Sequence, residues 1–172
     1  ELVQNGEVDI GISTIRNADT SLLWDIIIVD DVVVVCLPDH PLARQVEVDW
    51  EDLQRYPCIT IRPEVGTRRI IDLELASAKL SLDFVFEVSS AWTVVGMVNA
   101  GLGIGITTGL VRRLAPIYNF RICRIRGLTV RQEIAAVCHK DRSFSPAAKL
   151  FHRFVTSEGI VGFQPPARDD AK

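Results

Sequence analysis

Residues 62–69, with the sequence RPEVGTRR, carry the side chains in this sequence that are best suited to binding a small anion. They leave an apolar segment through a polar loop and enter a helical segment, which Thr67 is placed to cap. The backbone N–H groups of a helix start, with the guanidinium groups of Arg62 and Arg68, suit a small carboxylate. The alternative is a solvated basic loop, and the residue types alone leave both interpretations open.

Hydroxyl side chains follow two other apolar segments. Ser13 and Thr14 end the first predicted strand, and Thr107 and Thr108 end a later one. Hydroxyl groups at strand ends can hydrogen-bond a ligand, and they can equally satisfy the backbone of their own turn. Both pairs therefore remain open candidates for a binding site.

The histidines do not form a catalytic or metal-binding set along the sequence. His40 lies between Asp39 and Pro41 without a nearby nucleophile, so we expect it to cap or support a turn. His139 and His152 lack the histidine or acidic partner, three or four residues away, that typical zinc ligands on one element have. We therefore predict no metal ligand, no cofactor and no catalytic residue.

The glycine-rich segment 101–105, GLGIG, resembles a dinucleotide-binding loop in composition only. A dinucleotide loop follows a strand and opens a helix, whereas this segment follows a predicted helix and opens a predicted strand. We expect its glycines to allow a tight turn and a close approach of backbone.

Strand-like and helix-like segments alternate along the chain. The apolar, β-branched run 32–37 is typical of a central strand that is covered on both faces. Helical patterns lie at 49–53, 67–79, 91–100 and 146–157, and strand patterns at 8–12, 22–29, 58–61, 84–88, 104–107, 120–125 and 132–138. This order predicts an α/β fold with largely parallel sheets and helices on both faces. Open sheets of this type bind ligands outside the carboxyl ends of their strands.

The composition excludes several classes of protein. The chain has 172 residues, of which 48% are hydrophobic, so it can bury a core and is not a disordered protein. Its net charge of -3 makes it a poor binder of nucleic acid. No apolar run approaches the roughly 18 residues of a membrane-spanning helix.

The four cysteines indicate a reducing compartment. Cys36, Cys58, Cys123 and Cys138 are too far apart for a zinc knuckle or a CxxC motif. Three of them lie in apolar, strand-like runs, which is typical of buried thiols in a cytoplasmic protein.

An ordered series of motifs resembles the effector-binding domain of bacterial LysR-type transcriptional regulators. The motifs are GEVDIGI at 6–12, an apolar strand followed by PDHPLA at 38–43, DL at 52–53 with YP at 56–57, VNAGLGIGI at 98–106 and FSPAA at 144–148. Each motif is weak alone, but the set covers about residues 1–160 in order. The family usually has proline at the position of Thr108.

The resemblance implies two Rossmann-like lobes of the type 2 periplasmic-binding-protein kind, joined by two crossover segments. Lobe one would hold residues 1–45 and 131–160 and would be incomplete, lobe two would hold 46–130, and 161–172 would be a flexible tail. The resemblance also implies that the first strand and helix of lobe one, and a winged helix-turn-helix that binds DNA, belong to a part that is missing here.

The resemblance further implies a small-molecule effector, for which a carboxylate fits, in the cleft between the lobes. The matching positions are Ser13, Thr14, Thr60, Arg62, Gly66, Thr67, Ile106 and Thr107. The full-length regulator would be a cytoplasmic homodimer or tetramer without a membrane partner, and it would contact DNA only through the missing domain.

Two other functions stay open on the same fold. A solute-binding transport receptor would need an export signal, and the HPLA motif with four unpaired cysteines speaks against it. An enzyme would need a convergent acid, base or nucleophile, and the sequence does not supply such a set. We therefore expect a sensing domain and no enzyme.

Overall fold

The computed structural model describes residues 1–14, 20–128 and 131–157, and the chain forms two compact units. Unit 1 comprises Glu1–Asp30 and the residues from Gln132 onward, and unit 2 comprises Asp31–Arg131. Within these described ranges, no helix has the length and apolarity needed to cross a membrane.

The division between the units differs from the predicted one at its first boundary. Lobe one was predicted to extend to residue 45, whereas the first boundary between the units lies between Asp30 and Asp31. The reason is that strand β3 (Val32–Cys36) pairs with two strands of unit 2. The second boundary lies between Arg131 and Gln132, one residue from the predicted position. The predicted tail, 161–172, lies outside the described residues.

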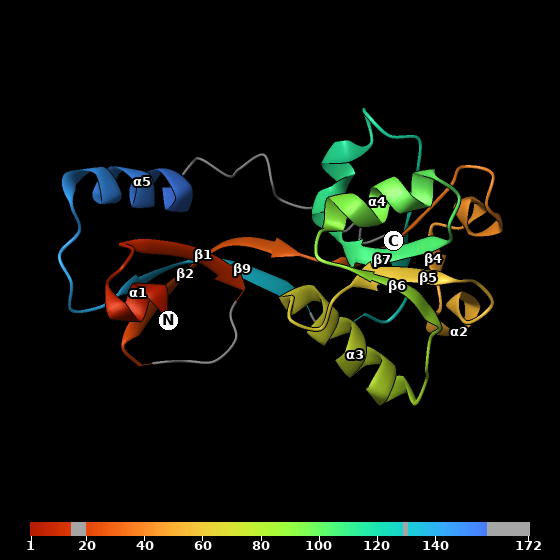
Figure 1. Cartoon of the computed structure of the whole chain (residues 1–172), viewed down its shortest axis with the longest axis horizontal. Helices are drawn as coiled ribbons and strands as arrows, with labels where there is room; N and C mark the ends of the chain where they lie inside the picture. The colour runs from red at the N-terminus through yellow and green to blue at the C-terminus, as the bar shows by residue number, and fades with distance from the viewer. Residues whose placement is uncertain (15–19, 129–130, 158–172) are drawn as a thin grey trace, which may run out of the picture. The chain divides into compact units, whose positions relative to one another are not determined.

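Unit 1 contains a three-stranded sheet with the strand order β1-β9-β2, and both pairs are antiparallel. Its elements are α1 (Leu2–Asn5), β1 (Ile10–Thr14), β2 (Leu22–Asp30), β9 (Gln132–His139) and α5 (Pro146–Ser157). Helices α1 and α5 lie on opposite sides of this sheet (Figure 1). Residues from the two ends of the sequence therefore form one layered unit.

Helix α5 begins as its sequence predicts. Ser145 precedes Pro146, and the Ser145 hydroxyl accepts a hydrogen bond from the Ala148 N–H at 3.2 Å. Ala148 and Val155 are buried against the sheet, with His152 on the same stripe of the helix. Two larger apolar side chains of this helix, those of Leu150 and Phe154, are 68% and 60% exposed.

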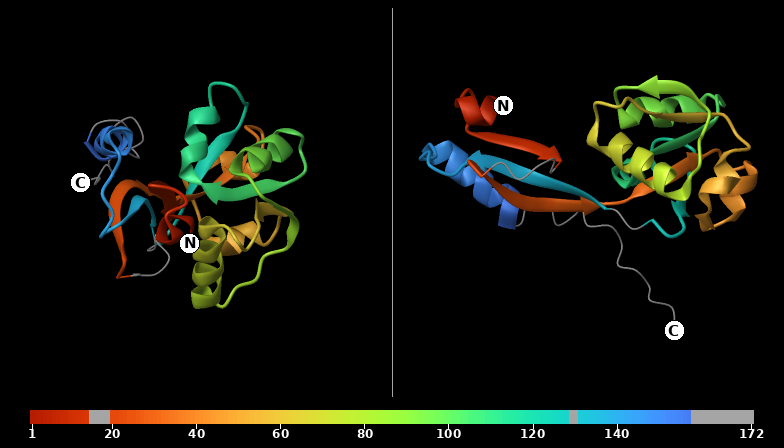
Figure 2. Two further views of the ribbon diagram at one scale, coloured as in Figure 1. Left: turned by 60° about the vertical axis from the view of Figure 1, so that its left-hand side comes forward. Right: turned by 90° about the horizontal axis from the view of Figure 1, so that it is seen from below.

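Unit 2 contains a six-stranded sheet with the strand order β4-β8-β3-β7-β5-β6. Besides β3, its elements are η1 (Pro41–Arg44), β4 (Glu47–Val48), α2 (Trp50–Leu53), β5 (Cys58–Ile61), α3 (Gly66–Ala78), β6 (Phe84–Val88), α4 (Ala91–Asn99), β7 (Ile104–Thr108), η2 (Gly109–Leu114) and β8 (Arg121–Ile125). Helices α3 and α4 cover opposite faces of this sheet (Figures 1 and 2).

The sheet of unit 2 is mixed, which corrects the prediction of largely parallel sheets. Strands β7, β5 and β6 are mutually parallel, as are β4 and β8. Strand β3 runs antiparallel to both of its neighbours, β7 and β8. The α/β fold itself, with helices on both faces of a sheet, is confirmed.

The core of unit 2 follows from the alternation of side chains along its central strands. On β3, Val32, Val34 and Cys36 pack on the face of the sheet that α3 covers through Ile71. Val33 and Val35 point to the other face, where α4 packs with valines of its own. All five residues of β3 are at most 1% exposed, as its continuous apolar sequence predicts.

The glycine-rich segment makes the predicted tight turn from α4 into β7. Gly101 and Gly103 have φ angles of 76° and 149°, which residues with a side chain rarely adopt. At Gly105, a Cβ atom would lie 2.6 Å from Cγ1 of Val94 and 3.0 Å from Cγ2 of Val98. The absence of a side chain at Gly105 therefore lets α4 approach the sheet closely.

The structure also confirms two local predictions. His40 begins η1, where its Nδ1 atom accepts a hydrogen bond from the Leu42 N–H at 3.2 Å. All four cysteines are free thiols with buried side chains.

Candidate functional site

The candidate site lies at the carboxyl ends of the three parallel strands β5, β6 and β7. Because neighbouring parallel strands end at one edge of a sheet, the segments that follow them lie side by side there. Residues 62–65 lead from β5 into α3, and Ser89 and Ser90 lead from β6 into α4. The starts of two helices therefore lie at this edge.

Three of the predicted site residues lie on the strands themselves. The Thr60 hydroxyl donates a hydrogen bond to the Ile106 carbonyl at 3.1 Å, which ties β5 to β7. The Ile106 side chain packs in the core, so only its backbone is available for polar contacts. Among the described residues, the buried Thr107 hydroxyl has no hydrogen-bond partner.

Arg62 and Gly66 lie at the open side of the same edge. The Arg62 N–H donates to the Val88 carbonyl at 2.8 Å, which fixes the loop against the end of β6 while the side chain remains exposed. Gly66, which is partly exposed, is the first residue of α3. An exposed arginine side chain and the start of a helix thus lie on one loop, whose backbone is bonded to the end of β6.

Thr67 does not have the predicted capping role. Helix α3 begins at Gly66, with Val65 in the capping position and no side-chain hydrogen bond there. Thr67 is consequently inside the first turn, and its side chain is 2% exposed. It is a buried helical residue and not a loop residue.

Arg68, the second guanidinium of the predicted anion site, is occupied within unit 2. Its Nε atom lies 2.7 Å from Oδ1 of Asp72, and its Nη1 atom binds Glu87 and the Ile61 carbonyl. The guanidinium carbon lies 4.5 Å from the centre of the Phe84 ring. Burial lowers the pKa of Arg68, but the hydrogen bonds to Asp72 and Glu87 outweigh burial and raise it overall, so the side chain stays charged. Arg68 therefore fastens α3 to β5 and β6.

Ser89 and Ser90 belong to this edge, although the sequence analysis did not include them in the site. The Ser90 hydroxyl accepts a hydrogen bond from the Trp92 N–H at 3.2 Å and caps α4. The strand pattern 84–88 followed by two serines was the available signal. What the sequence could not supply was the pairing of β6 with β5, which brings Val88 beside Ile61.

Ser13 and Thr14 lie in unit 1, at the end of β1. Ser13 is exposed, and its hydroxyl donates to the Thr14 carbonyl at 3.4 Å. The two residues pair with Ala135 and Ile134 of β9. The structure thus brings six of the eight predicted residues to one edge of unit 2 and places the other two on unit 1.

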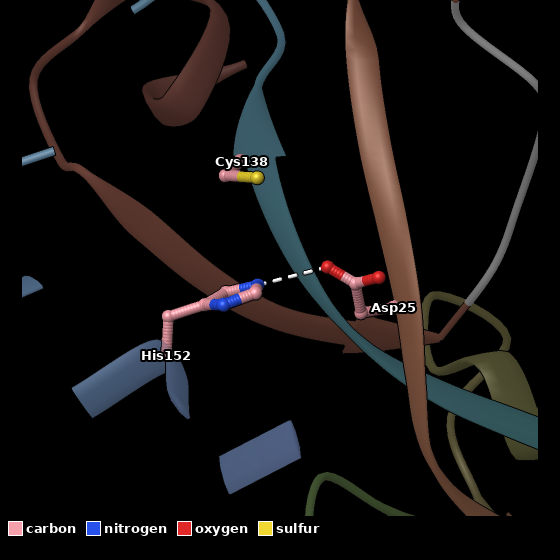
Figure 3. Close-up of side chains that lie close together, drawn as sticks. All are labelled: Asp25, Cys138 and His152. Carbon is pink, nitrogen blue, oxygen red and sulfur yellow. Dashed lines mark hydrogen bonds and ion pairs between the residues drawn. The ribbon is translucent and has the colours of Figure 1, made fainter. Parts of the chain in front are cut away.

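A second group of polar side chains, in unit 1, was not predicted from the sequence. Asp25 of β2, Cys138 of β9 and His152 of α5 converge, and one ligand atom from each lies within 4.8 Å of the others (Figure 3). The Nε2 atom of His152 is 2.8 Å from Oδ2 of Asp25. Asp25 is more than a hundred positions from the other two residues in sequence, so local spacing could not find the group. The position of His152 between Ala148 and Val155 on the buried stripe of its helix was the one available signal.

The sequence matches known proteins over most of its length. Residues 1–159 match the family model of the LysR substrate binding domain. The chain is 32% identical over 151 residues to the HTH-type transcriptional regulator YbhD of Escherichia coli, covering 88% of this chain and 48% of that protein. The chain thus spans about half the length of the curated relatives that it matches.

Solved structures show the same fold. The effector binding domain of QuiR in complex with shikimate superposes with a TM-score of 0.79 at 24% identity, covering 90% of this chain and 73% of that chain. The CcmR regulatory domain of Synechocystis in complex with 2-PG gives a TM-score of 0.80 at 17% identity, covering 95% and 79%.

Proposed function

The chain belongs to the LysR substrate-binding domain family, and on that premise we propose that it senses a small-molecule effector within a bacterial transcriptional regulator. The family model covers residues 1–159, and the relatives include several HTH-type regulators. The proposed regulator is cytoplasmic, acts as a homodimer or tetramer, and contacts DNA through a domain outside this chain. The net charge of -3 supports this division, because phosphate backbones bind basic surfaces.

The carboxyl edge of β5, β6 and β7 is our candidate for the effector-binding surface of unit 2. The observation that carries this proposal is the exposed Arg62 beside the first turn of α3, with its loop held against Val88. A guanidinium and the positive end of a helix favour an anionic ligand, so we propose a small carboxylate. Shikimate, named as the ligand of the QuiR domain, is a compound of this class.

The remaining predicted residues have different proposed contributions. Gly66 offers backbone N–H at the start of α3, and Thr60, Thr67, Ile106 and Thr107 shape the edge from buried positions. Ser13 and Thr14 of unit 1 stay in the proposed set on the family resemblance alone.

Effector binding would act on transcription through a shift in population. A ligand that binds one conformation of the domain more tightly than another favours that conformation in proportion to the difference in affinity. The linked DNA-binding domain would then respond to the same equilibrium.

Calorimetric titration of the chain with shikimate and then with a panel of small carboxylates tests this proposal. We expect Arg62→Ala to weaken binding of the responding ligand by about tenfold or more, because a charge-assisted hydrogen bond contributes about 1.5–3 kcal/mol. Arg69→Ala is the matched control, since Arg69 is an exposed arginine of the same helix start. Equal affinities of the two variants would remove Arg62 from the site.

Two alternatives on the same fold make different predictions. A solute-binding transport receptor would bind its ligand without any effect on DNA binding by the full-length protein. An enzyme would convert members of the metabolite panel into products. Product formation in such an assay would favour the enzyme.

A further inference from the structure

We propose that Asp25, Cys138 and His152 of unit 1 form a binding site for a zinc ion. None of these residues belongs to the proposed effector-binding set, and all three lie on β2, β9 and α5. A carboxylate oxygen, a thiolate sulfur and an imidazole nitrogen are the three ligand types that zinc binds in proteins.

The strand register places two of the ligands on one face of the sheet. Leu23 is opposite Cys138 and Asp25 is opposite Ala136, so Asp25 and Cys138 are diagonal neighbours on adjacent strands. Side chains two residues apart on a strand point to the same face, and diagonal neighbours are within reach of one another. The sheet therefore fixes the separation of the carboxylate and the thiol.

Helix α5 brings the third ligand to the same face. His152 follows the buried Ala148 by four residues and precedes the buried Val155 by three, so all three share the stripe that contacts the sheet. The imidazole points from α5 toward Asp25, as Figure 3 shows. The Phe144 ring, with its centre 5.3 Å from that of His152, packs beside it.

The present distances are close to those that zinc requires. Tetrahedral bonds of ordinary length to nitrogen, oxygen and sulfur separate the ligand atoms by about 3.4–3.6 Å. The three ligand atoms now lie within 4.8 Å of one another, and the closest pair, Nε2 of His152 and Oδ2 of Asp25, is at 2.8 Å. Rotation of the side chains would lengthen the 2.8 Å distance and shorten any distance near 4.8 Å to the required spacing.

The burial of the ligands fits an ion that enters from solvent. Cys138 is 3% exposed, whereas the Asp25 side chain is 48% exposed and that of His152 is 23% exposed. The exposed carboxylate can therefore contact the hydrated ion first, and the buried thiol lies on the inner side of the site. Three protein ligands leave a fourth position for water or another ligand. Binding would remove the thiol proton, as thiolate coordination requires.

Cobalt titration of the 172-residue chain, under reducing conditions, tests the site directly. Tetrahedral cobalt bound through a thiolate gives a near-ultraviolet charge-transfer band and intense visible bands, and zinc should displace it. We expect one equivalent of cobalt to give these bands in the wild-type chain. We expect Cys138→Ser to abolish the charge-transfer band, and Asp25→Asn and His152→Gln each to weaken zinc binding by more than about tenfold.

The matched controls are His139→Gln, which changes the neighbouring residue on the opposite face of β9, and Cys58→Ala, which removes a buried thiol of unit 2. Both should keep the wild-type spectrum and affinity. Circular dichroism checks the folding of each variant, and zinc should raise the unfolding temperature of the wild type more than that of Asp25→Asn.

Absence of the charge-transfer band in the wild type, or its persistence in Cys138→Ser, overturns the proposal. If Cys138→Ser does not fold, the half-exposed Asp25→Asn variant decides, and wild-type zinc affinity in that variant overturns the proposal equally.

Discussion

Arg62 and Arg68 are six positions apart in one basic stretch, yet their surroundings give them different roles. Arg62 keeps its side chain in solvent at the end of β5. Arg68 is buried and shared between Asp72, Glu87 and the Ile61 carbonyl. A charged side chain can bind a ligand only if the fold does not already pair it. Of these two arginines, only Arg62 therefore remains a candidate for contact with the effector.

The contacts of Arg68 predict that the protein loses stability when this side chain is shortened. Arg68→Ala removes ion pairs to two partly exposed carboxylates, a hydrogen bond to a carbonyl and packing over Phe84. Because both carboxylates can be solvated again, we expect a moderate loss of about 1–2 kcal/mol in the free energy of unfolding. Urea unfolding followed by circular dichroism measures it, with Arg69→Ala expected within about 0.5 kcal/mol of the wild type. Equal stability of the two variants would contradict the fastening role.

His40 predicts a dependence of stability on pH. Burial lowers the pKa of His40 below its ordinary value of about 6.5, an effect that nearby Asp39 partly offsets. Its Nδ1 atom accepts the Leu42 N–H, which only an unprotonated nitrogen can do. The contribution of His40 is therefore present above the pKa of the unfolded state and is lost as pH falls through the lower pKa of the folded state.

We expect this contribution to be about 0.5–1 kcal/mol, as for other helix caps. Urea unfolding at a series of pH values in the wild type and in His40→Asn measures it. Asparagine caps without titrating, so the variant should lose less stability on acidification. An identical pH profile for the two proteins would count against this role.

Helix α4 packs closely against strand β7 of unit 2 at Gly105. Gly105→Ala would place a methyl group 2.6 Å from Cγ1 of Val94, so the helix must move. We expect a loss of about 1–3 kcal/mol in the free energy of unfolding. Gly96→Ala is the matched substitution within α4 itself, where nothing lies within 4 Å, and it should stabilise by about 0.5–1 kcal/mol. Chemical denaturation of both variants checks the opposite signs, and a tolerated alanine at position 105 would refute the argument.

Elements were predictable where the signal is local. The continuous apolar run of β3, the turn after α4 and the Ser145–Pro146 start of α5 follow from neighbouring residues. The antiparallel direction of β3 was not predictable, because its partners β7 and β8 lie some seventy or more positions away and carry no register signal in the sequence.

The candidate site, too, was predictable only where the signal is local. Arg62 and the helix that follows it were visible in residue types, and the start of α3 was misplaced because Val65, a poor capping residue, occupies the capping position. The ion pair of Arg68 with Glu87 and the contact of His152 with Asp25 join segments that are distant in sequence. No spacing rule on a single element could have found them.

On the scale of the whole molecule, unit 2 is continuous in sequence and contains a complete core. Both of its buried clusters are formed within residues 32–125. We therefore predict that residues 31–131, produced alone, fold into a cooperative domain. Urea unfolding should give a single transition at the same midpoint by circular dichroism and by tryptophan fluorescence. A fragment without such a transition would show that unit 2 needs the rest of the chain.

Unit 1 has the opposite organisation, and the strand order β1-β9-β2 has a consequence for synthesis on the ribosome. Strands β1 and β2 are made first, but the strand that pairs with both begins at Gln132, after all of unit 2. The nascent chain therefore presents a finished unit 2 while two earlier strands still have open edges, where other chains can pair. Pairing with β9 covers one edge of each of these strands at the same time, so the synthesis of this late strand determines how long those edges are exposed to aggregation.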